Sequence, residues 1–198
     1  MSRPTILHVY FAICSLLMSS GVYSQDEQLV LTEGGLGALS LKNNPSISVE
    51  GLRKLFPEYQ VKHGIYSGDS PDFHVFEVST KDEEILFEIV SFIEDDEPHD
   101  EGKDGSVVVP IHLLKVVSPR IPDAYGIRAG DSVAYIVRVR GKNLEFGASH
   151  HDVFLGGKNI FYNIETETDE SPERFALADV LRQSWRIRSI SWPQAAWE

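Results

Sequence analysis

The stretch that decides the fold is Val107–Val137, which reads VVVPIHLLKVVSPRIPDAYGIRAGDSVAYIV. Its first part, Val107–Val117, is an apolar run that predicts a long strand. A proline-rich link follows, and Gly126 and Gly130 bracket a tight turn that can lead directly into a helix. The stretch therefore carries an architectural signal and no chemical motif.

The segment Ser132–Arg140 at the end of this stretch fits two patterns. Val133, Ile136, Val137 and Arg140 recur at helical spacing, whereas Val133, Tyr135, Val137 and Val139 alternate as a strand would. Asp131 or Ser132 can cap a helix at this point, and the cap favours a short helix over a strand.

Further segments on both sides of this stretch have strand or helix patterns. The predicted strands are Gln28–Thr32, Ala38–Leu41, Tyr59–Tyr66, Phe73–Ser79, Ile85–Ile93, Leu144–Phe146, Val153–Leu155, Asn159–Ile164 and Trp185–Trp192. One helix is expected from a cap at Ser46 or Ser48 to Pro57, and another over Pro172–Ser184. These patterns predict an α+β fold, a mostly antiparallel twisted sheet with two or three short helices. The helix-after-glycine units near Ser48 and Ser132 also suggest an internal duplication.

The N-terminus resembles a secretory signal. Arg3 supplies a positive charge, Ile6–Met18 is mostly apolar, and Ser24 places a small residue before the expected cleavage point. We therefore expect residues 1–24 to be a signal peptide and residues 25–198 to form a single α+β envelope domain.

Other interpretations of the N-terminus are a membrane anchor, an ordinary helix or a lipid attachment at Cys14. The apolar run is shorter than the roughly 20 residues that span a bilayer, and His8 and Ser15 interrupt it. A lipid-attachment box needs a small residue before the cysteine, and Ile13 is bulky. We expect a periplasmic or secreted protein, and less so an outer-membrane lipoprotein.

Charge and cysteine content narrow the chemistry. Cys14 is the only cysteine, so a mature chain would contain neither disulfides nor a thiol nucleophile. The formal net charge is −12, and cleavage would remove Arg3 and no acid. This charge disfavours nucleic acid as a partner, and contact with a membrane is expected only through an anchored N-terminus.

No catalytic motif stands out in the sequence. A G-x-S-x-G elbow and an H-E-x-x-H pair are absent. The glycines of Gly34–Gly37 resemble a dinucleotide loop only superficially, because Ser40 occupies the third glycine position and no helix opens there. A tight turn or bulge is the favoured interpretation, and no cofactor is predicted.

Histidines and tryptophans are the remaining candidate site residues. His150, His151 and Asp152 form the only histidine cluster, but neighbouring residues of a strand point to opposite faces, which favours a polar loop over a metal site. His112, within the apolar run, is expected to be a hydrogen-bonded core or edge residue. Three tryptophans could line a groove, but the first two are expected to anchor the last strand in the core; they are Trp185, Trp192 and Trp197.

The segment Glu94–Asp104 holds seven acids and one lysine. A solvated loop between two strands is the simplest interpretation. Asp100, Asp104 and Gly105 partly match a calcium-binding loop, but the match fails at Gly102 and Ile111, where calcium ligands should stand. Cation binding by this segment stays open, and we predict no catalytic, cofactor-binding or metal-binding residue elsewhere.

Several passages resemble one known family. They are LTEGGLGAL (Leu31–Leu39), YQVKHG through FHVFEV (Tyr59–Val78), IPDAYGIRAGDS (Ile121–Ser132) and SISW (Ser189–Trp192). They are similar to a small proteobacterial envelope family whose best-known members are lipoproteins controlled by the envelope-stress sigma factor. Their molecular function is unknown. The resemblance implies a periplasm-facing α+β domain with no known active site, and the missing lipid-attachment box puts outer-membrane anchoring in doubt.

Together these observations predict a periplasmic or secreted binding or interaction module of the bacterial cell envelope. Its partner is an unknown envelope protein or ligand. The alternative is an envelope hydrolase that uses acidic residues without a recognisable motif, because acids are plentiful and a carboxylate pair in a cleft leaves no linear signature. Whether the protein is an enzyme stays open, and the missing motifs favour the answer no.

Overall fold

The main element of the fold is an antiparallel sheet of eight strands in the order β10-β11-β12-β13-β9-β7-β6-β5. The computed structural model describes residues 29–43, 45–67, 72–93, 107–141, 144–148, 153–166 and 175–193. Within them the elements are β1 (Leu31–Thr32), β2 (Gly35–Leu36), β3 (Leu39–Ser40), β4 (Ser46–Ile47), α1 (Val49–Leu55), β5 (Gln60–Tyr66), β6 (Phe73–Ser79), β7 (Ile85–Phe92), β8 (Val109–Pro110), β9 (Leu113–Val116), α2 (Val133–Arg140), β10 (Glu145–Ala148), β11 (Val153–Gly157), β12 (Ile160–Glu165), α3 (Leu177–Arg182) and β13 (Arg186–Trp192). The fold is α+β, mostly antiparallel with short helices, as predicted.

Two small sheets accompany the main sheet: β1-β2-β3 and the pair β4-β8. The pair β4-β8 shows that one prediction was wrong, because Val107–Val117 is not a single strand. Pro110 lies in β8 opposite Ser46, and β9 begins three residues later in the main sheet. Between them Ile111 N donates to Pro45 O (2.8 Å) and His112 N donates to Val90 O (3.0 Å), so the chain exchanges one strand partner for another.

The first two helices begin at serine caps. In α1 the Ser48 Oγ accepts a hydrogen bond from Gly51 N (3.1 Å), and in α2 the Ser132 Oγ accepts one from Tyr135 N (3.2 Å). Gly141, which follows α2, has a φ of 69°, a conformation that favours glycine. The helix favoured for Ser132–Arg140 is therefore confirmed.

Among the residues that the structure describes, no helix has the length and apolar character needed to cross a bilayer. The expected signal peptide over residues 1–24, with Cys14, lies outside the described residues.

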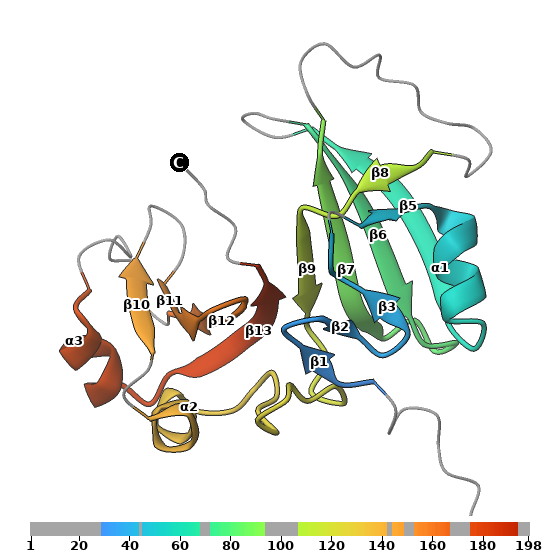
Figure 1. The fold of residues 1–198 in the computed structure, drawn as a ribbon. Coiled ribbons are helices and arrows are strands. Elements are labelled where there is room, and N and C mark those ends of the chain that lie inside the picture. Colours follow the sequence, from blue (N-terminus) through green and yellow to red (C-terminus); the bar gives the residue numbers. More distant parts are fainter. Residues whose placement is uncertain are drawn as a thin grey trace, which may run out of the picture.

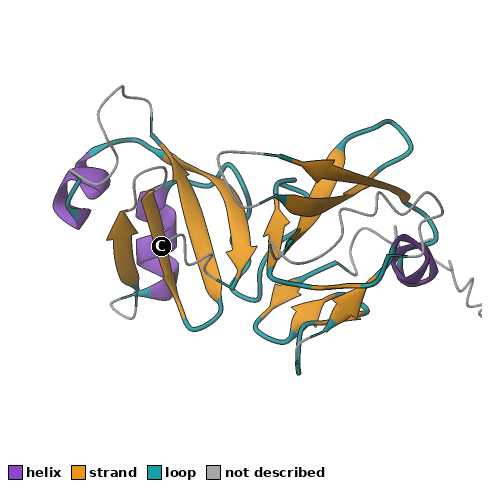
Figure 2. Cartoon of the chain, turned by 90° about the horizontal axis from the view of Figure 1, so that it is seen from above, coloured by secondary structure: helices purple, strands orange, loops and turns teal. Residues whose placement is uncertain are grey.

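The main sheet consists of two halves with the same order of elements (Figure 1). In the first half α1 precedes β5, β6 and β7, and β9 completes the group. In the second half α2 precedes β10, β11 and β12, and β13 completes the group. The two halves meet where β9 pairs with β13. Seen from above, the strands form two groups side by side (Figure 2). This order agrees with the internal duplication that the two helix-after-glycine units suggested.

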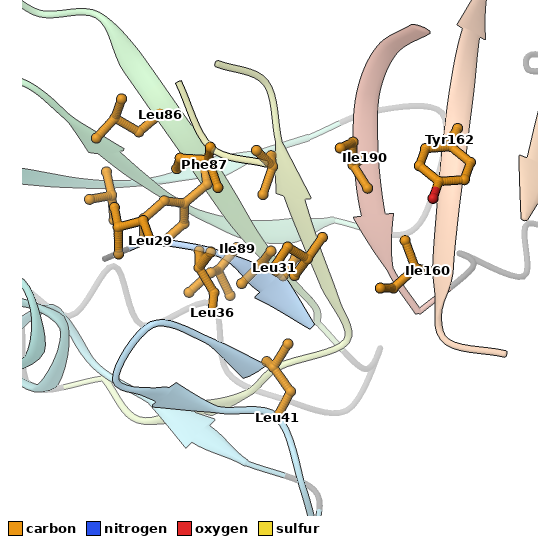
Figure 3. Packing of buried hydrophobic residues seen from close by; sticks show 14 of the residues in the cluster. Leu29, Leu31, Leu36, Leu41, Leu86, Phe87, Ile89, Ile160, Tyr162 and Ile190 are labelled. Carbon is orange, nitrogen blue, oxygen red and sulfur yellow. The ribbon is translucent and has the colours of Figure 1, made fainter. Parts of the chain in front are cut away.

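One hydrophobic core, the main core, runs through both halves on one face of the main sheet. All three helices contribute to it, through buried residues such as Leu52, Ile136 and Val180. Figure 3 shows Leu31 of the N-terminal segment near Ile89 of β7, with residues of the second half continuing the same core. The opposite face of the sheet carries a separate, smaller apolar cluster.

Candidate functional site

Two histidines meet at one end of the main sheet, on the face that carries the main core. His63 of β5 and His74 of β6 lie diagonally across the strand pair, and their Nε2 and Nδ1 atoms are 2.9 Å apart. One ring donates and the other accepts, depending on the tautomers. The rings are stacked, with centroids 5.1 Å apart, and His63 also stacks on Phe76 (4.5 Å). We call His63 and His74 the histidine pair.

A buried hydroxyl lies beside the histidine pair. Ser91 of β7 is the direct cross-strand partner of His74, so both side chains point to the same face of the sheet. Ser91 is 1% exposed, and its Oγ has no hydrogen-bond partner in the structure. Three polar side chains from three adjacent strands therefore line up at the margin of the main core.

The surroundings of the histidine pair favour neutral imidazoles. Burial lowers the pKa of His63, and the neighbouring His74 lowers it further. His74 is only 6% exposed. The pair can share or pass one proton between two rings, but a second proton would place two charges side by side at the edge of an apolar core. In the described part of the chain, no group of three or more metal-binding side chains adds further ligands.

The opposite face at this end of the sheet carries what we call the outer cluster, formed by Phe73, Val75, Val90, Phe92 and Leu113. The cluster is bordered by two further rings: Tyr66, which is 52% exposed, stacks on Phe73 (6.1 Å), and the exposed His112 stacks on Phe92 (5.3 Å). Its position follows from strand alternation, because these residues alternate with residues of the main core along β6 and β7. The outer cluster thus places aromatic side chains on the sheet face opposite the helices.

Charged side chains adjoin the outer cluster on the same face. Lys115 of β9 and Glu88 of β7 form an ion pair (3.5 Å), and Lys62 of β5 lies 3.7 Å from Glu83. These pairs are largely exposed or half-buried, so each adds little to stability. The face therefore combines an apolar patch with a charged border.

A second polar cluster is buried in the other half, around Asp123 of the link. The Tyr162 hydroxyl donates to Asp123 Oδ2 (2.6 Å), and Asp123 Oδ1 accepts from the backbone N of Tyr125 and of Ile127 (2.8 Å each). Arg140 donates to the Tyr162 oxygen (2.7 Å) and lies over the Tyr125 ring (4.0 Å). We call this the Asp123 network.

The Asp123 network has a structural role. Burial raises the pKa of Tyr162, and the hydrogen bond to Asp123 raises it further. Both carboxylate oxygens of Asp123 are occupied by donors, and Asp123 is 2% exposed. The N-terminal segment is bound here as well, because Leu31 N donates to Pro122 O (2.9 Å) and Ala124 N to Leu31 O (2.8 Å). The network therefore ties the link to β1 and β12.

Some candidate residues from the sequence are now placed. His112 accepts a hydrogen bond at Nδ1 from Phe92 N (2.9 Å), as expected for an edge residue. Trp185 is buried in the main core and Trp192 packs against it, donating from Nε1 to Glu33 O (3.1 Å). A Cβ on Gly35 would lie 2.3 Å from Leu39 O, which fits a tight hairpin with close backbone contact.

Other candidates lie outside the described residues. They are His150, His151 and Asp152, Trp197, and the acidic segment Glu94–Asp104 with Gly105. Their predicted roles, a polar loop, a tail and a solvated or cation-binding loop, remain predictions.

Sequence reasoning missed the histidine pair and the Asp123 network. The strands β5 and β6 were predicted, and a hairpin between them would have brought His63 close to His74 or to a neighbour of it. The register, which fixes the actual pairing, depends on a turn whose geometry the sequence does not give. Asp123 carried a weak signal, because an aspartate that begins a glycine-containing turn often accepts backbone hydrogen bonds from residues further along the turn.

Comparison with known proteins shows the fold and no function. No family model matches the chain, and no curated protein does either. Among solved structures, the crystal structure of the uncharacterized protein yfeY from Escherichia coli is similar, with a TM-score of 0.57 and 18% sequence identity. The match covers 83% of this chain and 99% of that one. This chain thus has the fold of an uncharacterized bacterial protein.

Proposed function

We propose that this protein is a periplasmic or secreted binding module of the bacterial cell envelope and that its partner is another envelope protein. The signal-like N-terminus and the family resemblance support the location. The observation that carries the binding role is the outer cluster, an aromatic patch with a charged border on the sheet face opposite the helices.

The composition of the outer cluster suits a protein partner. Aromatic side chains are enriched at protein interfaces, where they bury a large apolar area and lose few rotamers. Tyr66 is 52% exposed at the border of the cluster. Val75, Val90 and Leu113 are themselves buried, at 7–8% exposure, so the accessible part of the surface is its aromatic margin, Tyr66 with the half-buried Phe73 and Phe92. Aromatic side chains gathered on one face of a sheet are typical of an interaction surface.

The hydrolase alternative has no support from the described carboxylates. It requires an acid whose pKa is raised by burial or by a second carboxylate. The described carboxylates with a resolved shift go the other way. A hydrogen bond from Lys54 lowers the pKa of Glu50, and one from the backbone of Ala176 lowers that of Asp179.

Site-specific photo-crosslinking in the native host tests the proposal. A photoreactive phenylalanine derivative replaces Tyr66 at the border of the outer cluster, and in a matched control it replaces Val139, which is 37% exposed on α2. We expect a discrete adduct with an envelope protein from position 66 and none from position 139. Equal adducts at both positions, no adduct, or recovery of the protein from the cytoplasmic fraction would contradict the proposal.

A further inference from the structure

We propose that the free edge of β5 binds an extended, positively charged segment of the partner protein by strand addition. This inference rests on the proposed function and names the contact that would carry it. Strand β5 is the last strand of the main sheet and pairs with β6 on one side only. An edge strand presents backbone N–H and C=O groups that a second chain can pair with.

The register shows which groups of β5 face outward. Ile93 N donates to Asp72 O (2.8 Å), so residues 72 and 74 of the β6 side direct their backbone groups toward β7. Alternation then directs the backbone groups of Val75 toward its β5 partner Gly64. The residues between the paired positions of β5, which are Val61, His63 and Ile65, therefore point their N–H and C=O groups to the free edge.

A hydrogen bond agrees with this assignment and marks where the edge is covered. Arg53 of α1 donates from Nη2 to Val61 O (3.5 Å), which requires that carbonyl to face away from β6. For His63 and Ile65, the described residues provide no partner at the edge. An incoming strand would therefore pair along the second half of β5, next to the exposed Tyr66.

A hollow adjoins the beginning of the same edge. It has a volume of about 470 Å³ and is lined by Arg53, Pro57, Tyr59, Gln60, Val61 and Lys62. An added strand that pairs at His63 and Ile65 would continue past this hollow. Strand addition derives affinity from backbone hydrogen bonds and selectivity from side-chain pockets. Here the edge of β5 would supply the backbone hydrogen bonds, and the hollow would supply the pocket.

Charge indicates which partner fits. The formal net charge of the chain is −12, and among the described residues between Leu29 and Val116 nine acids stand against six lysines or arginines. Near β5, Lys54 pairs with Glu50 (2.7 Å) and Lys62 with Glu83 (3.7 Å), and Arg53 donates to Val61 O. Glu58 and Glu77 have no ion pair with any residue that the structure describes. A basic segment complements this charge, and a second copy of the chain would be repelled by it.

Fluorescence anisotropy with defined peptides tests the inference on the purified full chain. The probe is a labelled heptapeptide, Lys-Val-Lys-Val-Lys-Val-Lys. Its controls are the same peptide with N-methyl groups on alternate residues, which removes the donors, and the glutamate-for-lysine peptide, which reverses the charge. Because two or more backbone hydrogen bonds are lost, we expect binding to the N-methylated peptide to be weaker by about ten-fold or more.

Two variants at one position isolate the edge itself. Ile65→Pro removes an N–H that faces outward, so the pairing with β6 stays intact, and Ile65→Val keeps that N–H as a matched control. We expect Ile65→Pro to weaken peptide binding by about ten-fold and Ile65→Val to leave it within about two-fold. Equal binding by the N-methylated peptide, or undiminished binding by a folded Ile65→Pro chain, would overturn the inference. The peptide controls decide the matter if Ile65→Pro does not fold.

The crosslinking assay separates this inference from the proposed function. If the Tyr66 adduct forms and persists in the Ile65→Pro chain, strand addition is wrong and the binding module stands. If the peptide binds the edge as expected but no envelope adduct forms in the native host, the proposed function fails instead.

Discussion

At the scale of single residues, Tyr162 connects the link, α2 and β12 through one buried hydroxyl. Its hydroxyl donates to Asp123 and accepts from Arg140, and the side chain is fully buried. Removing the hydroxyl leaves a buried carboxylate oxygen without a donor, and such a loss costs more than the hydrogen bond itself contributes.

We therefore predict that Tyr162→Phe lowers the free energy of unfolding by about 1–3 kcal/mol. Urea denaturation followed by circular dichroism measures the change. Tyr66→Phe, which alters an exposed ring, is the control and should stay within about 0.5 kcal/mol of the wild type. Similar losses in both variants would show that the Asp123 network makes no special contribution to the free energy of unfolding.

The histidine pair predicts a dependence of stability on pH. The pKa of His63 is lowered in the folded protein, so below the ordinary value of about 6.5 the unfolded chain binds a proton that the folded chain does not. The contribution of His63 to stability is present above this pH and declines as the pH falls toward its lower, folded pKa.

We expect His63→Gln to flatten the decline of the unfolding free energy between neutral pH and about pH 5. Urea titrations at a series of pH values measure both chains, with His112→Gln as the control for an exposed histidine. A decline of the same steepness in wild type and His63→Gln would refute the role of the pair.

At the scale of secondary-structure elements, two glycines allow aromatic rings to lie across the second half of the main sheet. A Cβ on Gly147 of β10 would lie 2.1 Å from the Phe154 ring, and one on Gly156 of β11 would lie 2.2 Å from the Phe161 ring and 2.8 Å from Ile160 O. Either ring thus occupies the space of a missing side chain. Only the Gly156 position is also closed by backbone.

This difference predicts different outcomes for the two alanine variants. Gly156→Ala should destabilise the protein by about 1–3 kcal/mol, and shortening Phe161 should not restore it, because the Ile160 carbonyl remains in place. The stability lost in Gly147→Ala should be restored in the double variant Gly147→Ala with Phe154→Leu, because only the Phe154 ring lies in the way. Thermal unfolding of the two single variants and of the two double variants, Gly147→Ala with Phe154→Leu and Gly156→Ala with Phe161→Leu, measures these changes in stability. Restored stability in Gly156→Ala with Phe161→Leu would contradict the role of the Ile160 carbonyl.

The elements were largely predictable from local patterns, and their partners were not. The serine caps and apolar spacing identified α1 and α2, and β6 was predicted with its actual bounds, because caps and alternation are local signals. The apolar run Val107–Val117 was predicted as one strand, since nothing in its pattern shows that Pro110 pairs with β4 and Leu113 with β7. The histidine pair was missed for the same reason, because it exists only through a register.

At the scale of the whole molecule, the question is whether two halves of similar topology behave as one unit. The β9–β13 junction has only three paired positions. The main core, in contrast, is continuous from Leu31 to Ile190, and Trp192 of β13 donates to Glu33 of the N-terminal segment. Burial on one shared face should therefore dominate over the short junction and couple the halves.

Coupling predicts that damage in the first half destabilises the second half equally. Ile89→Ala in β7, at a fully buried position, should lower the free energy of unfolding by about 2–5 kcal/mol. Circular dichroism reports on the whole chain, and tryptophan fluorescence reports on β13 and its surroundings, because all tryptophans lie at or beyond position 185. Both midpoints should shift together, while Val108→Ala, at a position 67% exposed, should move neither. A tryptophan transition that stays in place while circular dichroism shifts would mean that the halves unfold separately and that the shared core does not bind them into one domain.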